Sequence, residues 1–213
     1  MTLERRVLAV IETLKQDYPD AMCSLEYRKD YELLFSTRLA AQCTDARVNI
    51  VTKDLYARYD SLEKFADADI GELEAYIRPT GFFRMKARDL KAAAAVILSE
   101  YGGKVPGTME ELLKIPGVGR KTANLVLGDV FHTPGVVVAD THCIRITNLL
   151  GFTTSKDPAK VEARLRELLP PDESNNFCHR TVLHGRAVCV ARRPRCGECS
   201  IRVYCDYGSS QES

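Results

Sequence analysis

Apolar residues recur along this chain at the three- and four-residue spacing of amphipathic helices, and long runs of alternating apolar and polar residues are scarce. The first predicted helix has one apolar stripe, formed by Leu3, Val7, Val10, Ile11 and Leu14. A period near 3.6 residues is typical of a helix with one buried face, whereas a half-buried strand would alternate. The pattern therefore predicts an all-α protein.

Capping and breaking residues set the bounds of the other predicted helices. Longer helices are expected over 31–41, 45–59 and 83–101, and shorter ones should open at Ser61, Asp69 and Asp157-Pro158. Thr44 or Asp45 can cap the second of these, and Gly102-Gly103 can end the third. The chain after Cys205 is rich in small polar residues, and we expect it to be frayed.

Residues 109–131 have the pattern of two helices joined by a glycine-rich turn. Thr108 and Glu111 fit a capping box before the first helix, the chain turns at 116–119, and a second helix begins at Arg120. Glycine lets such a turn approach a phosphate closely, and free N–H groups at a helix start attract anions. A tight turn needs glycine in any case, so the motif alone supports phosphate binding and a purely structural role about equally.

Two residues near this helix-hairpin-helix are candidates for catalysis. Lys121 falls in the first turn of the second helix, and Asp140 follows the apolar run 136–138 at an expected helix N-cap. Most helix lysines are solvated surface groups. A lysine that loses its proton in a semi-buried pocket is a nucleophile that forms Schiff bases with aldehyde-like carbons. Asp140 can be both a cap and the acidic partner of Lys121.

Four cysteines stand close together near the C-terminus, with the spacing C-x6-C-x2-C-x5-C: Cys189, Cys196, Cys199 and Cys205. Such clustering predicts a metal site. Zinc ribbons usually have two C-x2-C knuckles and this segment has one, which favours an iron–sulfur cluster over zinc. The remaining cysteines, which show no such spacing, are expected to be buried thiols: Cys23, Cys43, Cys143 and Cys178.

Composition changes this picture little, but the distribution of charge adds a candidate surface. The 213 residues are 45% hydrophobic and 28% charged, as in a globular protein, with a net charge of +1. Between Cys178 and Cys205 there are six arginines and one acid, a local charge of +5. This stretch could dock on phosphates or be an ordinary solvated surface. The N-terminus lacks a signal core, so we expect a cytoplasmic protein.

Three segments taken together resemble the endonuclease III family of helix-hairpin-helix DNA glycosylases. They are residues 113–124, the triplet 140–142 and the four spaced cysteines, and the likeness runs from about residue 25 to Cys205. The resemblance implies a six-helix barrel domain at 22–135, with the helix-hairpin-helix at about 109–131. It also implies a discontinuous second domain, 1–21 with 136–213, that carries a [4Fe-4S] cluster on the four cysteines.

The same resemblance implies roles for residues that the pattern alone would not single out. Gln42 and Phe82 would be wedges that fill the space left by an extruded nucleotide, although Phe82 could also be a loop aromatic that packs inward. His142 would touch the DNA backbone. The remaining implied DNA contacts come from the hairpin and from the basic segment: Gly117, Val118, Gly119, Arg192, Arg193 and Arg195.

The implied activity is that of a bifunctional DNA glycosylase and abasic-site lyase of base excision repair. It would remove oxidised pyrimidines from duplex DNA, use Lys121 and Asp140 for catalysis, and cleave 3′ to the abasic site by β-elimination through a Schiff base. DNA would lie in a groove between the two domains. We expect a monomer, associated with the nucleoid if the source is bacterial.

Three alternatives remain at this point. A monofunctional adenine or mismatch glycosylase would share the hairpin, the aspartate and the cysteines, but it typically lacks a lysine at the position of Lys121. A non-enzymatic DNA-binding module needs only the hairpin and the basic segment. An iron–sulfur electron carrier needs only the cysteines, and it leaves the hairpin without a purpose.

Overall fold

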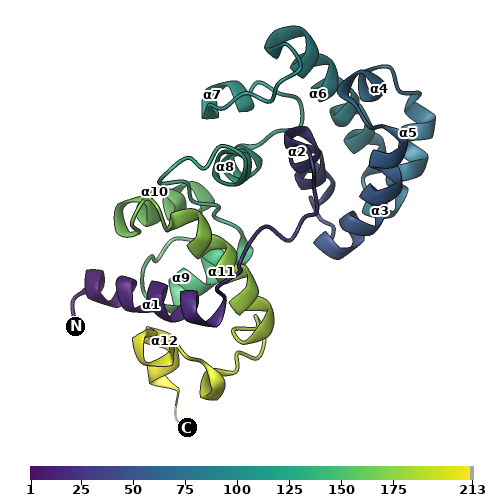
Figure 1. Ribbon diagram of the computed structural model, residues 1–213. Coiled ribbons are helices and arrows are strands. Elements are labelled where there is room, and N and C mark those ends of the chain that lie inside the picture. Colours follow the sequence, from purple (N-terminus) through teal and green to yellow (C-terminus); the bar gives the residue numbers. More distant parts are fainter. Residues whose placement is uncertain (212–213) are drawn as a thin grey trace. The chain divides into compact units, whose positions relative to one another are not determined.

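The computed structural model describes residues 1–211, and these contain helices and connecting loops without a strand (Figure 1). The chain divides into two compact units. One is continuous, Cys23–Phe131, and the other combines Met1–Met22 with the chain from His132 onward. The all-α fold predicted from the hydrophobic period is confirmed. No helix among the described residues is long and apolar enough to cross a bilayer.

The continuous unit is a helical bundle with α2 at its centre. α2 is buried on most sides because α3, α6 and α8 all pack against it. The helices of this unit are α2 (Asp30–Leu39), α3 (Asp45–Arg58), α4 (Leu62–Ala66), α5 (Ile70–Ile77), η1 (Arg78–Thr80), α6 (Phe83–Tyr101), α7 (Met109–Leu112) and α8 (Arg120–Asp129).

Side-chain caps begin four of these eight helices, at the capping residues that the sequence predicted. Thr44, Ser61, Asp69 and Thr108 each accept a hydrogen bond from the backbone N–H three residues later, which satisfies one orphan donor of the first turn. The capping box predicted at Thr108 is incomplete. The Glu111 carboxylate accepts from the Thr108 hydroxyl at 2.7 Å instead of from the Thr108 backbone N–H.

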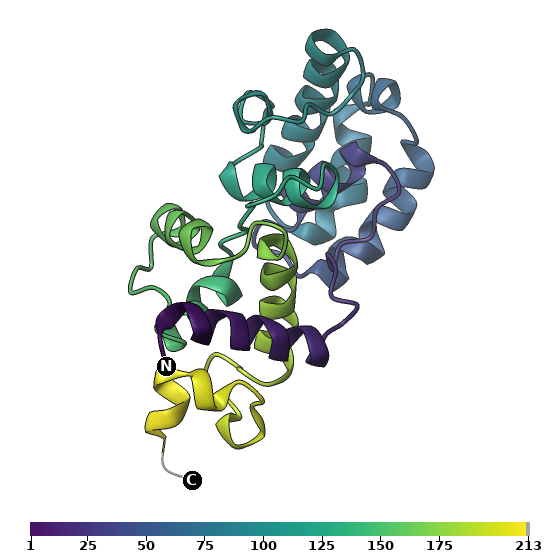
Figure 2. The same ribbon diagram turned by 60° about the vertical axis from the view of Figure 1, so that its left-hand side comes forward.

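The discontinuous unit is built around α11, against which both α1 and α9 pack (Figure 2). The buried face of α1 consists of the predicted apolar stripe without Leu3. The helices of this unit are α1 (Leu3–Asp17), α9 (Thr141–Leu149), α10 (Pro158–Leu168), α11 (Ser174–Ala187), η2 (Cys196–Glu198), η3 (Arg202–Tyr204) and α12 (Asp206–Ser210).

The prediction of a frayed tail after Cys205 is wrong for residues 206–210, which form α12. The Cys205 thiol accepts a hydrogen bond from the Gly208 N–H at 3.2 Å and so caps the helix. Arg202 donates to the carbonyls of Gly208 and Gln211, at 3.1 and 2.7 Å, and Arg6 pairs with Asp206. These contacts stabilise α12, although the composition of its residues alone favours disorder. Glu212 and Ser213 lie outside the described residues.

Candidate functional site

The hairpin between α7 and α8 is a tight turn that requires Gly117. This residue has φ = +77°, in the left-handed region where glycine is favoured. A Cβ at this position would lie 2.9 Å from Asp89 Cβ and 3.2 Å from Arg38 Cδ. Asp89 and Arg38 themselves form an ion pair of 2.6 Å. The turn therefore packs directly against the ion pair between Asp89 of α6 and Arg38 of α2.

The hairpin ends in a helix start that no side chain caps. Gly119 is the N-cap of α8 and offers no side-chain oxygen, so the first-turn N–H groups keep their capacity to bind an anion. The Val118 N–H differs, because it donates to the Ile115 carbonyl at 3.1 Å. Phosphate binding by Gly117, Val118 and Gly119 stays a prediction, and the Val118 amide is already used inside the turn.

The two candidate catalytic residues both stand at helix starts, but in different units. Lys121 is the second residue of α8 and is exposed. Asp140 is the half-buried N-cap of α9, as predicted, and its Oδ1 accepts from the Cys143 N–H at 2.7 Å. The cap does not use the second carboxylate oxygen, Oδ2. One side chain can therefore fix the start of α9 and still accept a proton.

The two predicted wedge residues share an unusual backbone conformation. Gln42 has φ = +56° and Phe82 has φ = +48°, and three non-glycine residues in the described chain have positive φ. Both side chains are exposed, Phe82 to 60%, so the alternative in which Phe82 packs inward is wrong. Left-handed backbone at a non-glycine residue is strained and is enriched at functional sites. Their action as wedges stays a prediction.

His142 and the arginines of the basic segment differ in how deeply they are buried, which the sequence did not indicate. His142 is half-buried, and its Nδ1 lies 3.3 Å from Arg145 Nη2. Gly185 of α11 makes room for the histidine, because a Cβ there would come within 2.4 Å of its Nδ1. His142 is thus packed against α11 and is not a free helix-surface histidine.

The local charge of +5 overstates the basic surface, because Arg180 is buried. Its side chain is 6% exposed, and its guanidinium pairs with Glu173 at 2.6 Å. The predicted DNA contacts Arg192, Arg193 and Arg195 are exposed in the loop before η2, and Arg195 lies 3.9 Å from Glu198. Arg180 therefore supports the fold of the discontinuous unit, while the exposed loop carries the surface charge.

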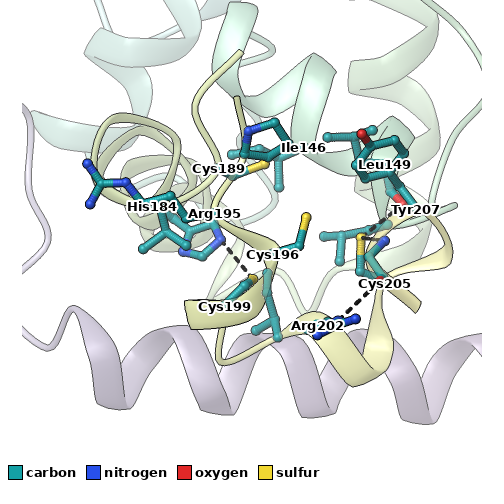
Figure 3. A pocket seen from close by; sticks show the side chains of 15 residues that line it. Ile146, Leu149, His184, Cys189, Arg195, Cys196, Cys199, Arg202, Cys205 and Tyr207 are labelled. Carbon is teal, nitrogen blue, oxygen red and sulfur yellow. Dashed lines mark hydrogen bonds between the residues drawn. The ribbon is translucent and has the colours of Figure 1, made fainter. Parts of the chain in front are cut away.

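The four clustered cysteines line one pocket together with apolar residues from α9 (Figure 3). Three of the four sulfurs have polar neighbours. Cys189 Sγ accepts from Arg145 at 3.4 Å, Cys199 Sγ lies 3.5 Å from His184 Nε2, and Cys205 Sγ accepts from a backbone N–H. Hydrogen bonds to cluster sulfurs are typical of iron–sulfur sites.

The cysteine thiols of this pocket need a nearby positive charge to be ionised. Burial, together with negative charge on the other three thiols, raises the pKa of Cys199 to about 11. Burial also raises the pKa of Cys189 and of Cys205. Iron ions would supply the charge that keeps such thiols ionised. Among residues 1–211, no group of three or more ligating side chains is arranged around a single metal ion. Four thiols around a wider pocket fit a cluster, in which each iron takes one of them.

The residues that surround the cysteines could not be identified from the sequence pattern. His184 is 1% exposed, and its Nδ1 lies 3.3 Å from the Tyr18 hydroxyl. Arg145 reaches both the Cys189 carbonyl and His142. The unclustered cysteines are also not all alike: Cys143 and Cys178 are buried as predicted, but Cys23 and Cys43 are half-buried.

Comparison with known proteins shows close relatives over nearly the whole chain. Endonuclease III of Synechocystis is 45% identical over 202 residues, which cover 95% of this chain and 92% of the relative. Endonuclease III of Bacillus subtilis is 38% identical, over 92% and 89% of the two chains. The sequence profile described as "HhH-GPD superfamily base excision DNA repair protein" matches residues 35–171. This chain belongs to the HhH-GPD superfamily.

The superfamily assignment extends to the cysteine segment and to the fold. The iron–sulfur binding domain of endonuclease III matches residues 189–205, so the iron–sulfur cluster predicted from the spacing is confirmed over zinc. A trapped endonuclease III–DNA covalent intermediate superimposes with a TM-score of 0.91 at 37% identity, covering 98% of each chain. A thermostable thymine-DNA glycosylase shares the fold, with a TM-score of 0.86 at 21% identity.

Proposed function

We propose that this superfamily member is a bifunctional DNA glycosylase and abasic-site lyase that acts on oxidised pyrimidines in duplex DNA. The observation that carries the proposal is Lys121, an exposed lysine in the first turn of the helix after the hairpin. A similar endonuclease III has been trapped as a covalent DNA intermediate, which needs a protein nucleophile. Lys121 would be that nucleophile, and Asp140 would be its acidic partner.

The first step is extrusion of the damaged nucleotide. A base inside a duplex is inaccessible, and rotating it outward costs a few kcal/mol, least for a damaged or mispaired base. Gln42 and Phe82 would occupy the vacated space, and their exposed, left-handed positions support this role. Side chains inserted between bases partly unstack them and hold the duplex open.

The second step joins the enzyme to the sugar. The neutral Lys121 amine attacks C1′, the new C–N bond forms as the glycosidic bond breaks, and the base leaves with the bonding electrons and takes up a proton. Asp140 accepts the proton that the lysine nitrogen loses, or stabilises positive charge on the sugar, through the oxygen that its cap does not use. Opening of the sugar ring gives the Schiff base.

The third step breaks the DNA strand. The protonated imine makes the C2′ proton acidic, a base removes it, and its electrons form the new double bond as the C3′–O bond breaks. The 3′ phosphate leaves, and water then hydrolyses the imine and frees Lys121. One lysine thus serves both the glycosylase step and the lyase step.

DNA would be held by the uncapped start of α8, by His142 and by the exposed arginines of the loop before η2, which are Arg192, Arg193 and Arg195. Backbone N–H groups and arginines both bind phosphate oxygens without reading sequence. The cysteines that hold the cluster flank this loop. Their proposed contribution is therefore structural, and the elimination chemistry involves no change of oxidation state.

Three broader expectations remain part of the proposal. The barrel domain would cover 22–135 and the cluster domain 1–21 with 136–213. The enzyme would act as a monomer on duplex DNA that contains damaged bases or abasic sites. It would work in the cytoplasm, on the nucleoid if the source is bacterial, because eight cysteines without a disulfide between them suit a reducing compartment.

Borohydride trapping on a duplex with one abasic site tests the proposal. Reduction of the imine should give a covalent protein–DNA adduct with the wild type and none with Lys121→Ala. Lys114→Ala is the matched control, since Lys114 is an exposed lysine of the same segment that pairs only at the surface with Glu110. Without an adduct from cluster-loaded wild type, the lyase claim fails and a monofunctional glycosylase or a DNA-binding module becomes the better assignment.

A further inference from the structure

Lys86 is a fully buried lysine that the reaction described above does not use. It lies on the first turns of α6, and its side chain is 0% exposed. Long cationic side chains are rarely buried in this way unless their nitrogen is hydrogen-bonded. The contacts of this nitrogen therefore indicate what the residue does.

The Lys86 nitrogen joins two chain segments that are far apart in sequence. Nζ donates at 2.8 Å to the carbonyl of Leu39, and at 2.8 Å to the carbonyl of Thr80. Leu39 is the last residue of α2, three residues before Gln42. Thr80 ends η1, two residues before Phe82. One nitrogen thus fixes the starting points of both predicted wedge loops.

The backbone of Lys86 strengthens the second of these links. Its N–H donates to the Phe82 carbonyl at 3.1 Å, so Lys86 holds the 80–82 segment from both its side chain and its main chain. The Leu39 carbonyl lies at the C-terminal end of α2, where the helix dipole favours a cation. Burial lowers the pKa of Lys86. Both bonds survive loss of a proton, since a neutral amine still has two hydrogens to donate.

We propose that Lys86 is a positioning residue that sets the distance and register between the Gln42 and Phe82 loops, so that both side chains enter the duplex at the same nucleotide. Both loops contain a strained left-handed residue, and such conformations persist only where the surroundings over-determine them. Lys86 supplies a constraint shared by the two loops. The inference rests on the proposed wedge roles of Gln42 and Phe82.

The test compares Lys86→Met with wild type in cluster-loaded, full-length protein. The measured quantity is lesion preference, the ratio of Kd for an undamaged duplex to Kd for a duplex with one tetrahydrofuran abasic analogue. Lys86→Met should lower this ratio by up to about 100-fold, the size of the effect that a misplacement of about 1 Å can have on a reaction rate. Affinity for the undamaged duplex should stay unchanged. A 2-aminopurine opposite the analogue should lose its unstacking signal in parallel.

Lys91→Met is the matched control. Lys91 is on the same helix and donates to one backbone carbonyl, that of Ala68, at 2.6 Å, away from both loops. It should keep the wild-type lesion preference whatever it does to the melting temperature. A loss of preference in Lys91→Met equal to that in Lys86→Met would overturn the inference, because general destabilisation would then explain both.

A double-variant cycle tests whether Lys86 acts through the wedges. Adding Lys86→Met to Gln42→Ala/Phe82→Ala should lower the preference no further, whereas independent effects would multiply. If Lys86→Met is unfolded at the assay temperature, Lys86→Gln replaces it; its amide can still donate to one carbonyl, and an intermediate loss is expected. A wild-type preference in folded Lys86→Gln would overturn the inference.

Failure of the inference and failure of the proposed function give different results. If Gln42→Ala/Phe82→Ala keeps the wild-type preference, the wedge roles and the inference both fail while borohydride trapping is unaffected. If no variant or wild type gives an adduct, the lyase function fails but the binding ratios still decide the role of Lys86. On single-stranded abasic DNA, where nothing needs extruding, Lys86→Met should form the adduct at the wild-type rate.

Discussion

Replacing Gly117 by alanine perturbs the hairpin at the point where it presses on the rest of the continuous unit. The backbone there has φ = +77°, and an added Cβ would lie 2.9 Å from Asp89 Cβ, a distance that real Cβ contacts essentially never show. The obstructing atoms belong to an ion-paired aspartate whose partner, Arg38, is also within 3.2 Å. Neither neighbour can move without loosening that pair.

The expected loss has two parts. A left-handed conformation costs a non-glycine residue about 1–2 kcal/mol. Forcing an extra carbon into a packed contact costs about 1–3 kcal/mol. Together they should lower the unfolding free energy by about 2–5 kcal/mol, which lowers Tm by roughly 5–15 °C in a chain of this length.

Thermal and urea unfolding of Gly117→Ala, Gly102→Ala and Gly119→Ala separates the two parts. Gly102 is left-handed, with φ = +60° and ψ = +33°, and has open space around its Cβ position, so Gly102→Ala should show the conformational part alone. Gly119 has negative φ and open space, and its variant should stay within about 1 kcal/mol of wild type. Equal losses in Gly117→Ala and Gly102→Ala would refute the claim that the contact with Asp89 matters.

Three further predictions concern the discontinuous unit. Arg180→Met should lower the unfolding free energy by about 1.5–3 kcal/mol, because it removes a buried hydrogen bond between charged groups. The control Arg186→Met, at an exposed position, should change the unfolding free energy by under about 0.5 kcal/mol. Urea unfolding of both variants and the wild type measures the difference. Burial raises the pKa of Glu173, but hydrogen bonds from Arg180 and Lys15 outweigh this and leave it below its usual 4.5. The unfolding free energy of the wild type should therefore exceed that of Glu173→Gln above about pH 4.5, and the difference should vanish as the pH falls through the lowered pKa of Glu173. Equal unfolding free energies of the two proteins at pH 7 would contradict this. Removing iron with a chelator should abolish the absorbance near 400 nm and the part of the helical circular dichroism signal that residues 196–210 contribute. The rate of amide hydrogen exchange should rise in residues 196–210 but not in α2–α8. If α12 keeps its protection from exchange, the structural role of the cluster is contradicted.

Helix starts could be predicted from sequence because capping is local. Thr44, Ser61, Asp69 and Asp157 each bond to a backbone N–H within three residues, so the chain segment itself contains both partners. The cysteine spacing was informative for the same reason, since all four thiols fall within one short segment. α12 was missed because a thiol caps it and because Arg6, Arg202 and α9, which lie outside the helix, supply contacts to it.

Burial of charged side chains could not be predicted, because it depends on partners from distant segments. Arg180 looked like part of a basic surface until the structure placed it against Glu173. No sequence pattern marks Lys86, since its acceptors lie 47 and 6 residues away. The left-handed backbone of Gln42 and Phe82 had no sequence signal either, because neither residue favours that region.

The division of the chain into one continuous and one discontinuous unit also sets an order of events during synthesis. Residues 23–131 leave the ribosome as one continuous unit and can fold at once, as continuous domains generally do. α1 emerges before this unit, yet it packs on α11 and contacts η3, which emerge more than 150 residues later. At a translation rate of about 5–20 residues per second, some ten to thirty seconds pass before its apolar stripe can be buried. α1 is therefore made before the continuous unit but is buried after it, and its apolar stripe stays exposed on the nascent chain until α11 and η3 have been translated.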